Sequence, residues 1–285
     1  SGKAKELMMK ALQTGADIIV FDQNLTPAQA EALSELTDLK VIDRTQLILD
    51  IFAKRAHTRE GKLKVELAQL KYTLPRLVGR GVAMSRLMGG IGGRGPGETK
   101  LEVDRRRIKE RIHRIEQELK EIAKSSQQRR VRRKRSGIPI VSIVGYTNVG
   151  KSTLLNALTN SDVKVEDKLF VTLDTTSRRL RFPEEREIIV TDTVGFIQKL
   201  PTQLVAAFRA TLEEVTEANL LLHVVDITHR NVQQQISTVG QVLTDLNAAN
   251  KPMLVALNKI DKLPDPSRAE EICKAYPHSV AISAL

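Results

Sequence analysis

Apolar residues near the start of the chain form two short runs of strand length with a helix signal between them. The runs are Ile18–Phe21 and Leu39–Ile42, each bounded by polar residues. Between them, Thr26 is suited to be a helix N-cap, and Pro27 would occupy the first helical turn. Strands that alternate with helices predict a small α/β unit here.

Two longer segments have apolar residues at steps of three and four, the spacing of one helix face. The first stripe is Leu63, Leu67, Leu70, Leu74 and Leu77, and the second is Ile108, Ile112, Ile115, Leu119 and Ile122. Pro75 should kink the first helix or end it early. We expect the helices to pack as an antiparallel hairpin whose stripes form a core rather than a cofactor site.

The segment between the two helices, Gly89–Glu98, is too rich in glycine for helix or strand. It is either a flexible connector or a loop whose bare backbone can lie against RNA phosphates. The second helix runs into Arg129–Arg135, which has six basic residues in seven positions. This run is expected to be a solvated, partly disordered linker, or else to strengthen phosphate binding.

The second half of the chain alternates between strand and helix patterns. Strands are expected at 140–144, 187–191, 220–225, 253–257 and 280–282, which predicts an α/β fold with a mostly parallel, doubly wound sheet. Ser136-Gly137-Ile138-Pro139 marks a boundary. We therefore assign residues 1–137 to an N-terminal domain, with its α/β part at about 1–60 and its hairpin at about 61–137, and residues 138–285 to a second domain.

Composition narrows the class of protein. The chain has 285 residues and one cysteine, and its net charge of +11 is concentrated before Gly137. A basic half favours a polyanionic partner, nucleic acid first and an anionic membrane second, although a solvated helix face would give the same bias. With no apolar run of about 20 residues, no signal peptide pattern and no possible internal disulfide, we expect a cytoplasmic protein without stable membrane insertion.

The loop after the strand at 140–144 fits the pattern G-x-x-x-x-G-K-[ST]. Its residues are Gly145, Tyr146, Thr147, Asn148, Val149, Gly150, Lys151 and Ser152. Glycines in this pattern let backbone N–H groups converge on phosphates at a helix N-terminus. Lys151 would reach the β and γ phosphates, and the Ser152 hydroxyl would bind Mg²⁺.

Three further motifs follow predicted strands in the order typical of a GTP-binding domain. Asp192-Thr193-Val194-Gly195 would serve the Mg²⁺ shell and the γ phosphate. In Asn258-Lys259-Ile260-Asp261, the Asp261 carboxylate can accept hydrogen bonds from guanine N1–H and the 2-amino group, which selects GTP over ATP. Ser283-Ala284-Leu285 would bring a backbone N–H to guanine O6.

Two positions leave the hydrolytic chemistry open. The switch threonine that completes Mg²⁺ coordination could be Thr172, Thr175 or Thr176, because spacing does not choose among them. Phe196 follows Asp192-Thr193-Val194-Gly195 directly, at a position where many related enzymes carry a glutamine that orients water, so no general base is assigned. His223 lies inside an apolar run and is expected to be a core strand histidine.

The chain resembles the HflX-type GTPases, a ribosome-associated family with a P-loop GTPase domain. The likeness rests on segments spread over most of the chain: residues 41–45 (VIDRT), 49–53 (LDIFA), 61–70 (GKLKVELAQL), 95–99 (GPGET) and 170–174 (FVTLD). It implies that Phe170, Val171, Thr172, Leu173 and Asp174 border the nucleotide, with Thr172 as the Mg²⁺ ligand. It also suggests that the N-terminus lies inside the α/β part and that the closing helix and C-terminal extension of the family are absent.

The resemblance implies a monomeric GTP hydrolase that uses GTP and Mg²⁺, binds the large ribosomal subunit and its rRNA through the basic domain, and splits stalled or idle ribosomes. Lys151 and Thr172 would support hydrolysis. The alternative is an RNA-binding ribosome-assembly factor that uses GTP as an occupancy switch without splitting activity.

Overall fold

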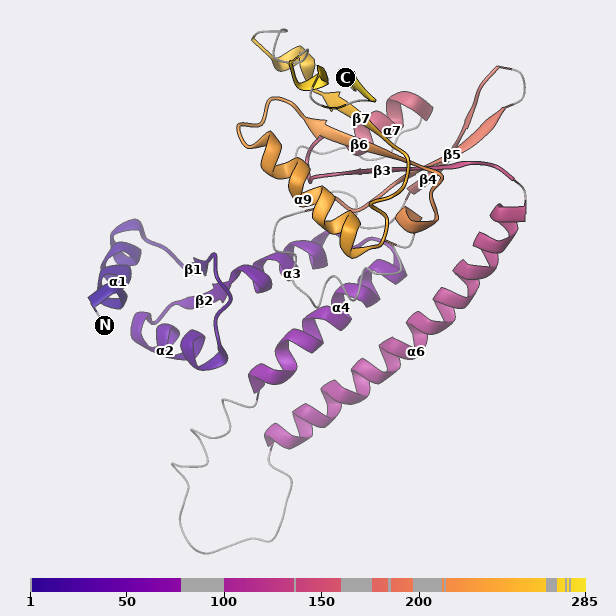
Figure 1. Cartoon of the computed structure of the whole chain (residues 1–285). Coiled ribbons are helices and arrows are strands. Elements are labelled where there is room, and N and C mark those ends of the chain that lie inside the picture. Colours follow the sequence, from indigo (N-terminus) through magenta and orange to yellow (C-terminus); the bar gives the residue numbers. More distant parts are fainter. Residues whose placement is uncertain are drawn as a thin grey trace, which may run out of the picture. The chain divides into compact units, whose positions relative to one another are not determined.

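The chain folds into two compact units in a computed structural model (Figure 1). One unit comprises residues 1–54 and 62–121, and the other comprises residues 55–61 and 122–285. The structure describes residues 2–77, 100–135, 137–159, 176–183, 186–196, 212, 214–264, 271–274, 276 and 278–285. No helix within these residues is long and apolar enough to span a membrane.

The first unit begins with the α/β part that the sequence predicts. Helix α1 (Gly2–Thr14), strand β1 (Ile18–Phe21), helix α2 (Pro27–Thr37), strand β2 (Lys40–Asp43) and helix α3 (Arg44–Arg55) follow one another, and β1 and β2 pair in parallel. Thr26 caps α2 as predicted: its hydroxyl accepts a hydrogen bond from the Gln29 backbone N–H, and the Gln29 side chain accepts one from the Thr26 N–H.

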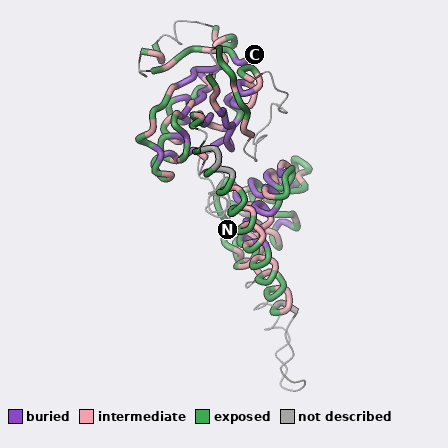
Figure 2. Tube along the Cα trace, turned by 90° about the vertical axis from the view of Figure 1, so that its right-hand side faces the viewer, coloured by how far each residue is buried: buried purple, intermediate pink, exposed green. Residues whose placement is uncertain are grey.

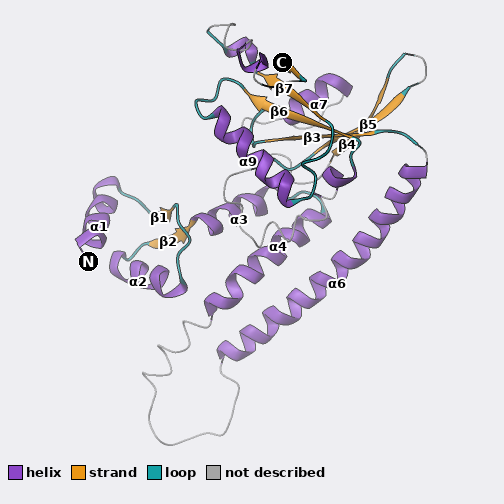
Figure 3. Ribbon diagram, in the orientation of Figure 1, coloured by secondary structure: helices purple, strands orange, loops and turns teal. Residues whose placement is uncertain are grey.

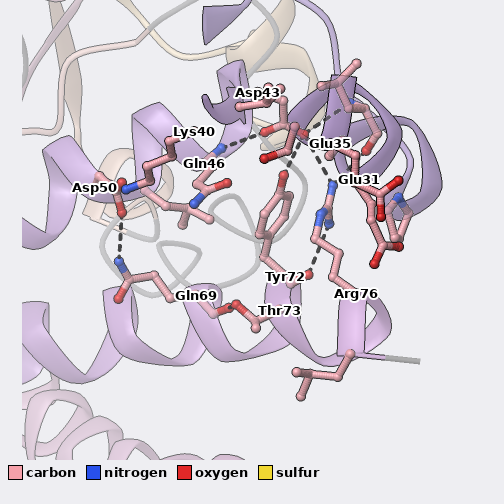
Figure 4. Close-up of a pocket in the computed structure, with 17 residues that line it drawn as sticks. Glu31, Glu35, Lys40, Asp43, Gln46, Asp50, Gln69, Tyr72, Thr73 and Arg76 are labelled. Carbon is pink, nitrogen blue, oxygen red and sulfur yellow. Dashed lines mark hydrogen bonds and ion pairs between the residues drawn. The ribbon is translucent and has the colours of Figure 1, made fainter. Parts of the chain in front are cut away.

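A buried carboxylate, Asp43, ties the elements of this unit together (Figure 4). Its Oδ2 accepts hydrogen bonds from the Tyr72 hydroxyl at 2.5 Å, the Leu25 N–H at 3.1 Å and the Arg76 guanidinium at 3.2 Å. Its Oδ1 accepts one from the Gln46 N–H at 2.8 Å, near the start of α3. The Arg76 guanidinium lies 3.4 Å from the Tyr72 ring centroid, and these groups line a pocket of about 730 Å³.

The predicted helical hairpin consists of α4 (Arg59–Thr73) and α6 (Lys100–Arg135), which run antiparallel (Figure 1). A bidentate Arg111–Glu66 pair at 2.7 and 2.8 Å and a Lys71–Glu116 pair at 2.7 Å join the two helices, and Ile115 is fully buried. As expected from Pro75, α4 stops at Thr73 and passes into the short 3₁₀ turn η1 (Leu74–Arg76).

One prediction about the hairpin is wrong. The basic run Arg129–Arg135 is not a disordered segment, because α6 continues through it to Arg135. Arginine and lysine are good helix formers, and no glycine or proline interrupts the segment before Gly137, whose φ of +68° turns the chain away from the helix. The predicted glycine-rich loop, Gly89–Glu98, lies outside the described residues.

The second unit contains a six-stranded sheet with the order β4-β5-β3-β6-β7-β8 (Figure 3). In chain order, the elements of this sheet and its surroundings that the structure describes are β3 (Ile140–Gly145), α7 (Lys151–Thr159), β4 (Thr176–Arg181), β5 (Glu187–Asp192), β6 (Leu220–Asp226), α9 (Val232–Asp245), β7 (Met253–Asn258), η2 (Ile260–Lys262) and β8 (Ser279–Ala281). All pairings are parallel except β4 with β5, which confirms the predicted sheet.

Neighbouring residues of β3 point to opposite faces of this sheet and define two cores. Val144 packs with Val239 and Leu243 of α9, whereas Ile143 packs with Leu154 and Leu155 of α7. Figure 2 shows buried positions gathered in the interior of this unit. Because β3, β5, β6, β7 and β8 are parallel, their C-terminal ends lie at one edge of the sheet, where the loops that carry the sequence motifs begin.

Candidate nucleotide-binding site

The loop from Gly145 to Gly150 has the tight backbone that its glycines predict. Gly145 and Gly150 have φ values of +155° and +95°, and Asn148 has +63°. A Cβ atom on Gly145 would collide with the Val224 carbonyl oxygen, and one on Gly150 would collide with the Asn258 amide nitrogen. Only glycine therefore fits at these two positions.

Lys151 and Ser152 open helix α7 directly after this loop. The Lys151 side chain is buried, and its Nζ donates to the Tyr146 carbonyl oxygen at 2.8 Å. Burial lowers the pKa of Lys151 to about 8, against an opposing effect of the Asp192 carboxylate. The Ser152 hydroxyl donates to Asp192 Oδ2 at 2.6 Å, so the loop serine and the carboxylate at the end of β5 meet.

The segment after β5 lies against the phosphate-binding loop. A Cβ atom on Gly195 would approach Thr147 Cα to 2.8 Å and Lys151 Nζ to 3.0 Å. Two backbone hydrogen bonds, Phe196 N–H to Gly145 O at 3.1 Å and Thr147 N–H to Phe196 O at 2.9 Å, join the two segments. Buried Thr193 donates to the Ile143 carbonyl oxygen at 2.7 Å.

The Phe196 side chain belongs to a hydrophobic core cluster. Its side chain is 1% exposed and packs in the core on the α9 side of the sheet. A side chain in that position offers no hydrogen bond to a water molecule. His223 is also buried, as predicted, and burial together with the nearby Lys151 charge lowers its pKa to about 4.

The motifs predicted to recognise guanine lie together at the ends of β7 and β8. Asn258 is buried, donates from Nδ2 to the Val149 carbonyl oxygen at 2.8 Å and accepts from the Ala284 N–H at 3.0 Å. The Ser283 hydroxyl donates to Asp261 Oδ1 at 2.7 Å. Asn258 thus joins the phosphate loop to the last loop, and Ser283 fixes one oxygen of Asp261.

The remaining predicted residues divide into described and undescribed ones. Ile260 is half-buried beside the core of β7, and Leu285 is exposed. The switch segment Phe170, Val171, Thr172, Leu173 and Asp174 lies outside the described residues, as does Thr175. Thr176, the third candidate threonine, is the first residue of β4.

The sequence reasoning missed Asp226, the last residue of β6. Its Oδ2 lies 2.7 Å from Lys259 Nζ, and the same Nζ donates to the Asn148 carbonyl oxygen at 2.9 Å. A signal was available, because Asp192 also ends a strand and was recognised. Asp226 lies outside the four sequence motifs, however, so the sequence alone does not single it out.

The fit of this site to a nucleotide can be judged from its own groups. A buried ammonium, close-packed glycine backbone and a hydroxyl beside a carboxylate suit a phosphate chain with a divalent cation. A carboxylate held by a serine suits a ring that presents two N–H donors. The fold and the site define a P-loop GTPase.

Comparisons with known proteins agree with this class. Three protein-family sequence models match the chain: "GTP-binding GTPase N-terminal" at residues 1–53, "GTP-binding GTPase Middle Region" at 55–133 and "50S ribosome-binding GTPase" at 140–259. GTPase HflX of Caldanaerobacter subterraneus is 58% identical over 262 residues, which cover 92% of this chain and 61% of that relative. The Escherichia coli HflX is 50% identical, with coverages of 93% and 62%.

The chain belongs to the HflX-type GTPase family, and it spans about three-fifths of the length of these relatives. Among solved structures, a GTP-binding protein from Sulfolobus solfataricus in complex with GDP matches with a TM-score of 0.50 and 27% identity. The match covers 99% of this chain and 79% of the other.

Proposed function

We propose that this chain binds GTP with Mg²⁺ at the strand ends of the second unit and hydrolyses it to GDP and phosphate. The observation that supports this most strongly is that three separate segments meet through short hydrogen bonds. Ser152, next to the buried Lys151, bonds to Asp192 at the end of β5, and Asn258 at the end of β7 bonds to the Val149 carbonyl oxygen of the phosphate-binding loop. Lys151 would neutralise the β and γ phosphates, and backbone N–H groups of residues 148–152 would surround them.

Guanine selection falls to Asp261, with Ser283 holding one of its oxygens and Lys259 covering the ring with its stem. Mg²⁺, which neutralises phosphate charge, would be held by Ser152 and Thr172. Asp192, now hydrogen-bonded to Ser152, would orient the water shell of the ion. In this proposal residues 1–137 form the N-terminal domain and residues 138–285 form the GTP-binding domain.

Hydrolysis by the isolated chain should be slow. Phe196 stands where related enzymes place a water-orienting glutamine, and its buried apolar ring has no group to contribute. The missing group would come from a partner or from another polar residue. Supply of a catalytic group in trans accelerates comparable enzymes by about 10³-fold or more.

The partner we propose is the large ribosomal subunit. The excess of basic residues before Gly137 suits rRNA, and the family model at 140–259 is described as a ribosome-binding GTPase. Triphosphate would favour the bound conformation, in which the protein separates the subunits of stalled or idle ribosomes, and hydrolysis would release it. The alternative is a ribosome-assembly factor for which GTP is only an occupancy signal.

One experiment separates these functions. GTP and ATP turnover would be measured with and without purified large subunits, and dissociation of intact ribosomes would be followed by light scattering. We expect preference for GTP, acceleration by large subunits and dissociation. Equal turnover in both conditions would contradict activation by the subunit, and activation without dissociation would favour the assembly factor.

A further inference from the structure

The carboxylate of Asp226 is held in one orientation at the edge of the guanine-recognition motifs. Its Oδ1 accepts hydrogen bonds from the Thr228 backbone N–H at 2.9 Å and the Thr228 hydroxyl at 2.6 Å. Its side chain is only 14% exposed. Burial alone would raise the pKa of Asp226, but hydrogen bonds from Lys259 and Thr228 outweigh it and hold the pKa below the usual value. The group is therefore charged at neutral pH.

The second oxygen of this carboxylate points at Lys259. The Asp226–Lys259 pair measures 2.7 Å, and the lysine side chain is 22% exposed. Lys259 has a left-handed backbone with φ of +69°, and its Nζ also bonds to the Asn148 carbonyl oxygen. Two acceptors on different segments, Asp226 Oδ2 and the Asn148 carbonyl oxygen, thus hold the Lys259 ammonium. The four-carbon stem that joins this ammonium to the Lys259 backbone is thereby kept in one conformation.

Asp226 can hold the lysine stem in place because its own backbone is anchored to the neighbouring strand. It pairs in register with Asn258 across β6 and β7, and the Ile227 N–H donates to the Asn258 carbonyl oxygen at 3.2 Å. Asn258 itself bonds to the phosphate loop. The carboxylate therefore belongs to the same rigid edge of the sheet that carries the recognition motif.

We propose that Asp226 is the positioning residue that holds the Lys259 stem as a wall of the guanine pocket and thereby sets how long a guanine nucleotide stays bound. This inference rests on the proposed function, in which Lys259 covers the base. Without Asp226, the Lys259 ammonium keeps only the Asn148 carbonyl oxygen of these two acceptors and turns toward water. The flexible lysine stem then no longer covers the guanine ring. A purely structural role of Asp226, through its hydrogen bonds with Thr228, would not depend on Lys259.

The test uses release of a fluorescent GDP from the whole chain. Loss of a charge-assisted hydrogen bond predicts that Asp226→Ala releases GDP about tenfold faster, with a smaller effect for Asp226→Asn. Dissociation constants for GDP and a non-hydrolysable GTP analogue should rise by the same factor, because the γ phosphate lies away from this contact. Asp245→Asn, on the exposed side of α9, is the matched charge control and should release GDP at the wild-type rate.

A double-mutant cycle with Lys259→Met separates positioning from a structural role. Asp226→Ala should have no further effect on GDP release when Lys259 is already methionine. An unchanged release rate in Asp226→Ala, or an undiminished effect in the Lys259→Met background, would overturn the inference. Failure of the wild type to bind any guanine nucleotide would instead overturn the proposed function.

Discussion

Asp261 should decide which base the protein accepts. Its carboxylate can accept from two guanine donors, while Ser283 occupies part of one oxygen. Asp261→Asn replaces one acceptor with a donor, so we expect a loss of about 2 to 3 kcal/mol in GTP affinity. Affinity for a xanthine nucleotide should rise, because the new amide N–H can donate to the carbonyl that xanthine carries in place of the 2-amino group. Competition calorimetry with the two nucleotides measures both effects. Equal binding of GTP and ATP by the wild type, unaffected by this change, would refute the assignment.

Lys151 makes nucleotide affinity depend on pH. Burial lowers its pKa to about 8 in the empty site, and a bound phosphate chain would raise it again by favouring the ammonium. Binding should therefore take up a proton above the lowered pKa, and affinity should fall as pH rises through it, by up to about tenfold per pH unit.

Calorimetry of GDP binding in buffers with different ionisation enthalpies would detect this proton. We expect uptake at about pH 8.5 and almost none at about pH 6.5, where Lys151 is charged in both states. Lys151→Arg removes the titration, since arginine stays protonated. Identical heats in all buffers at the higher pH would show that Lys151 does not titrate on binding.

At the level of single residues, the sequence predicts what recurring motifs specify. Lys151, Asp192 and Asp261 could be placed because strand ends and loop spacing set their positions. The Asp226–Lys259 contact could not, since it depends on the register between β6 and β7. The backbone hydrogen bonds that join Phe196 to the phosphate-binding loop could not be predicted from the sequence either, because they involve no particular side chain.

The elements of the first unit depend on Asp43 for their mutual placement. Tyr72→Phe removes one hydrogen bond to this buried carboxylate and should lower the free energy of unfolding by roughly 1 to 3 kcal/mol. Asp43→Ala removes the counter-charge of Arg76 and leaves two backbone N–H groups without their acceptor, so it should cost roughly 3 to 5 kcal/mol.

Urea unfolding of the whole chain, followed by circular dichroism, would measure these losses. The matched control is Tyr276→Phe, which removes an exposed hydrogen bond to Gln233 and should change stability little. If Tyr72→Phe and Tyr276→Phe were equally mild, Asp43 would not be the tie that the hydrogen bonds suggest.

Element boundaries show why some predictions succeeded and others failed. The Thr26 cap and the Pro75 break are local, so a few residues determine them. Strand β4 was missed because its sequence, TSRRLR, has a single apolar residue, and it is an edge strand paired on one side only. The length of α6 was underestimated because charge was read as disorder, although arginine and lysine favour helix.

For the whole molecule, the sequence predicts an α/β sheet because motifs and apolar runs alternate regularly. The two units are less predictable. The contacts that divide the chain at residues 54/55, 61/62 and 121/122 follow from side-chain packing between distant segments, which no local pattern encodes. Helix α6 contributes to both units. The boundary predicted near Gly137 marks where the helix pattern of the sequence stops, whereas the division at 121/122 marks where the contacts of the helix pass from one unit to the other.

The basic half should bind RNA with an affinity that falls steeply as salt increases. Each phosphate neutralised releases counterions, and the slope of log K against log salt is about −0.7 to −0.9 per contact. Replacing the six basic residues of Arg129–Arg135 with glutamine, which also favours helix, should make that slope shallower by up to about 4 to 5. GDP affinity should not change, since none of these residues belongs to the nucleotide site.

Filter binding of large-subunit RNA over a salt series would measure this slope. A second variant, with Lys3, Lys5 and Lys10 of α1 changed to glutamine, controls for net charge alone. If contact with RNA is made by the end of α6, the loss of slope per charge should be larger in the first variant. An unchanged slope in the first variant would mean that the basic residues at the end of α6 face solvent and do not contact RNA. The RNA-binding surface would then have to lie elsewhere in the basic half.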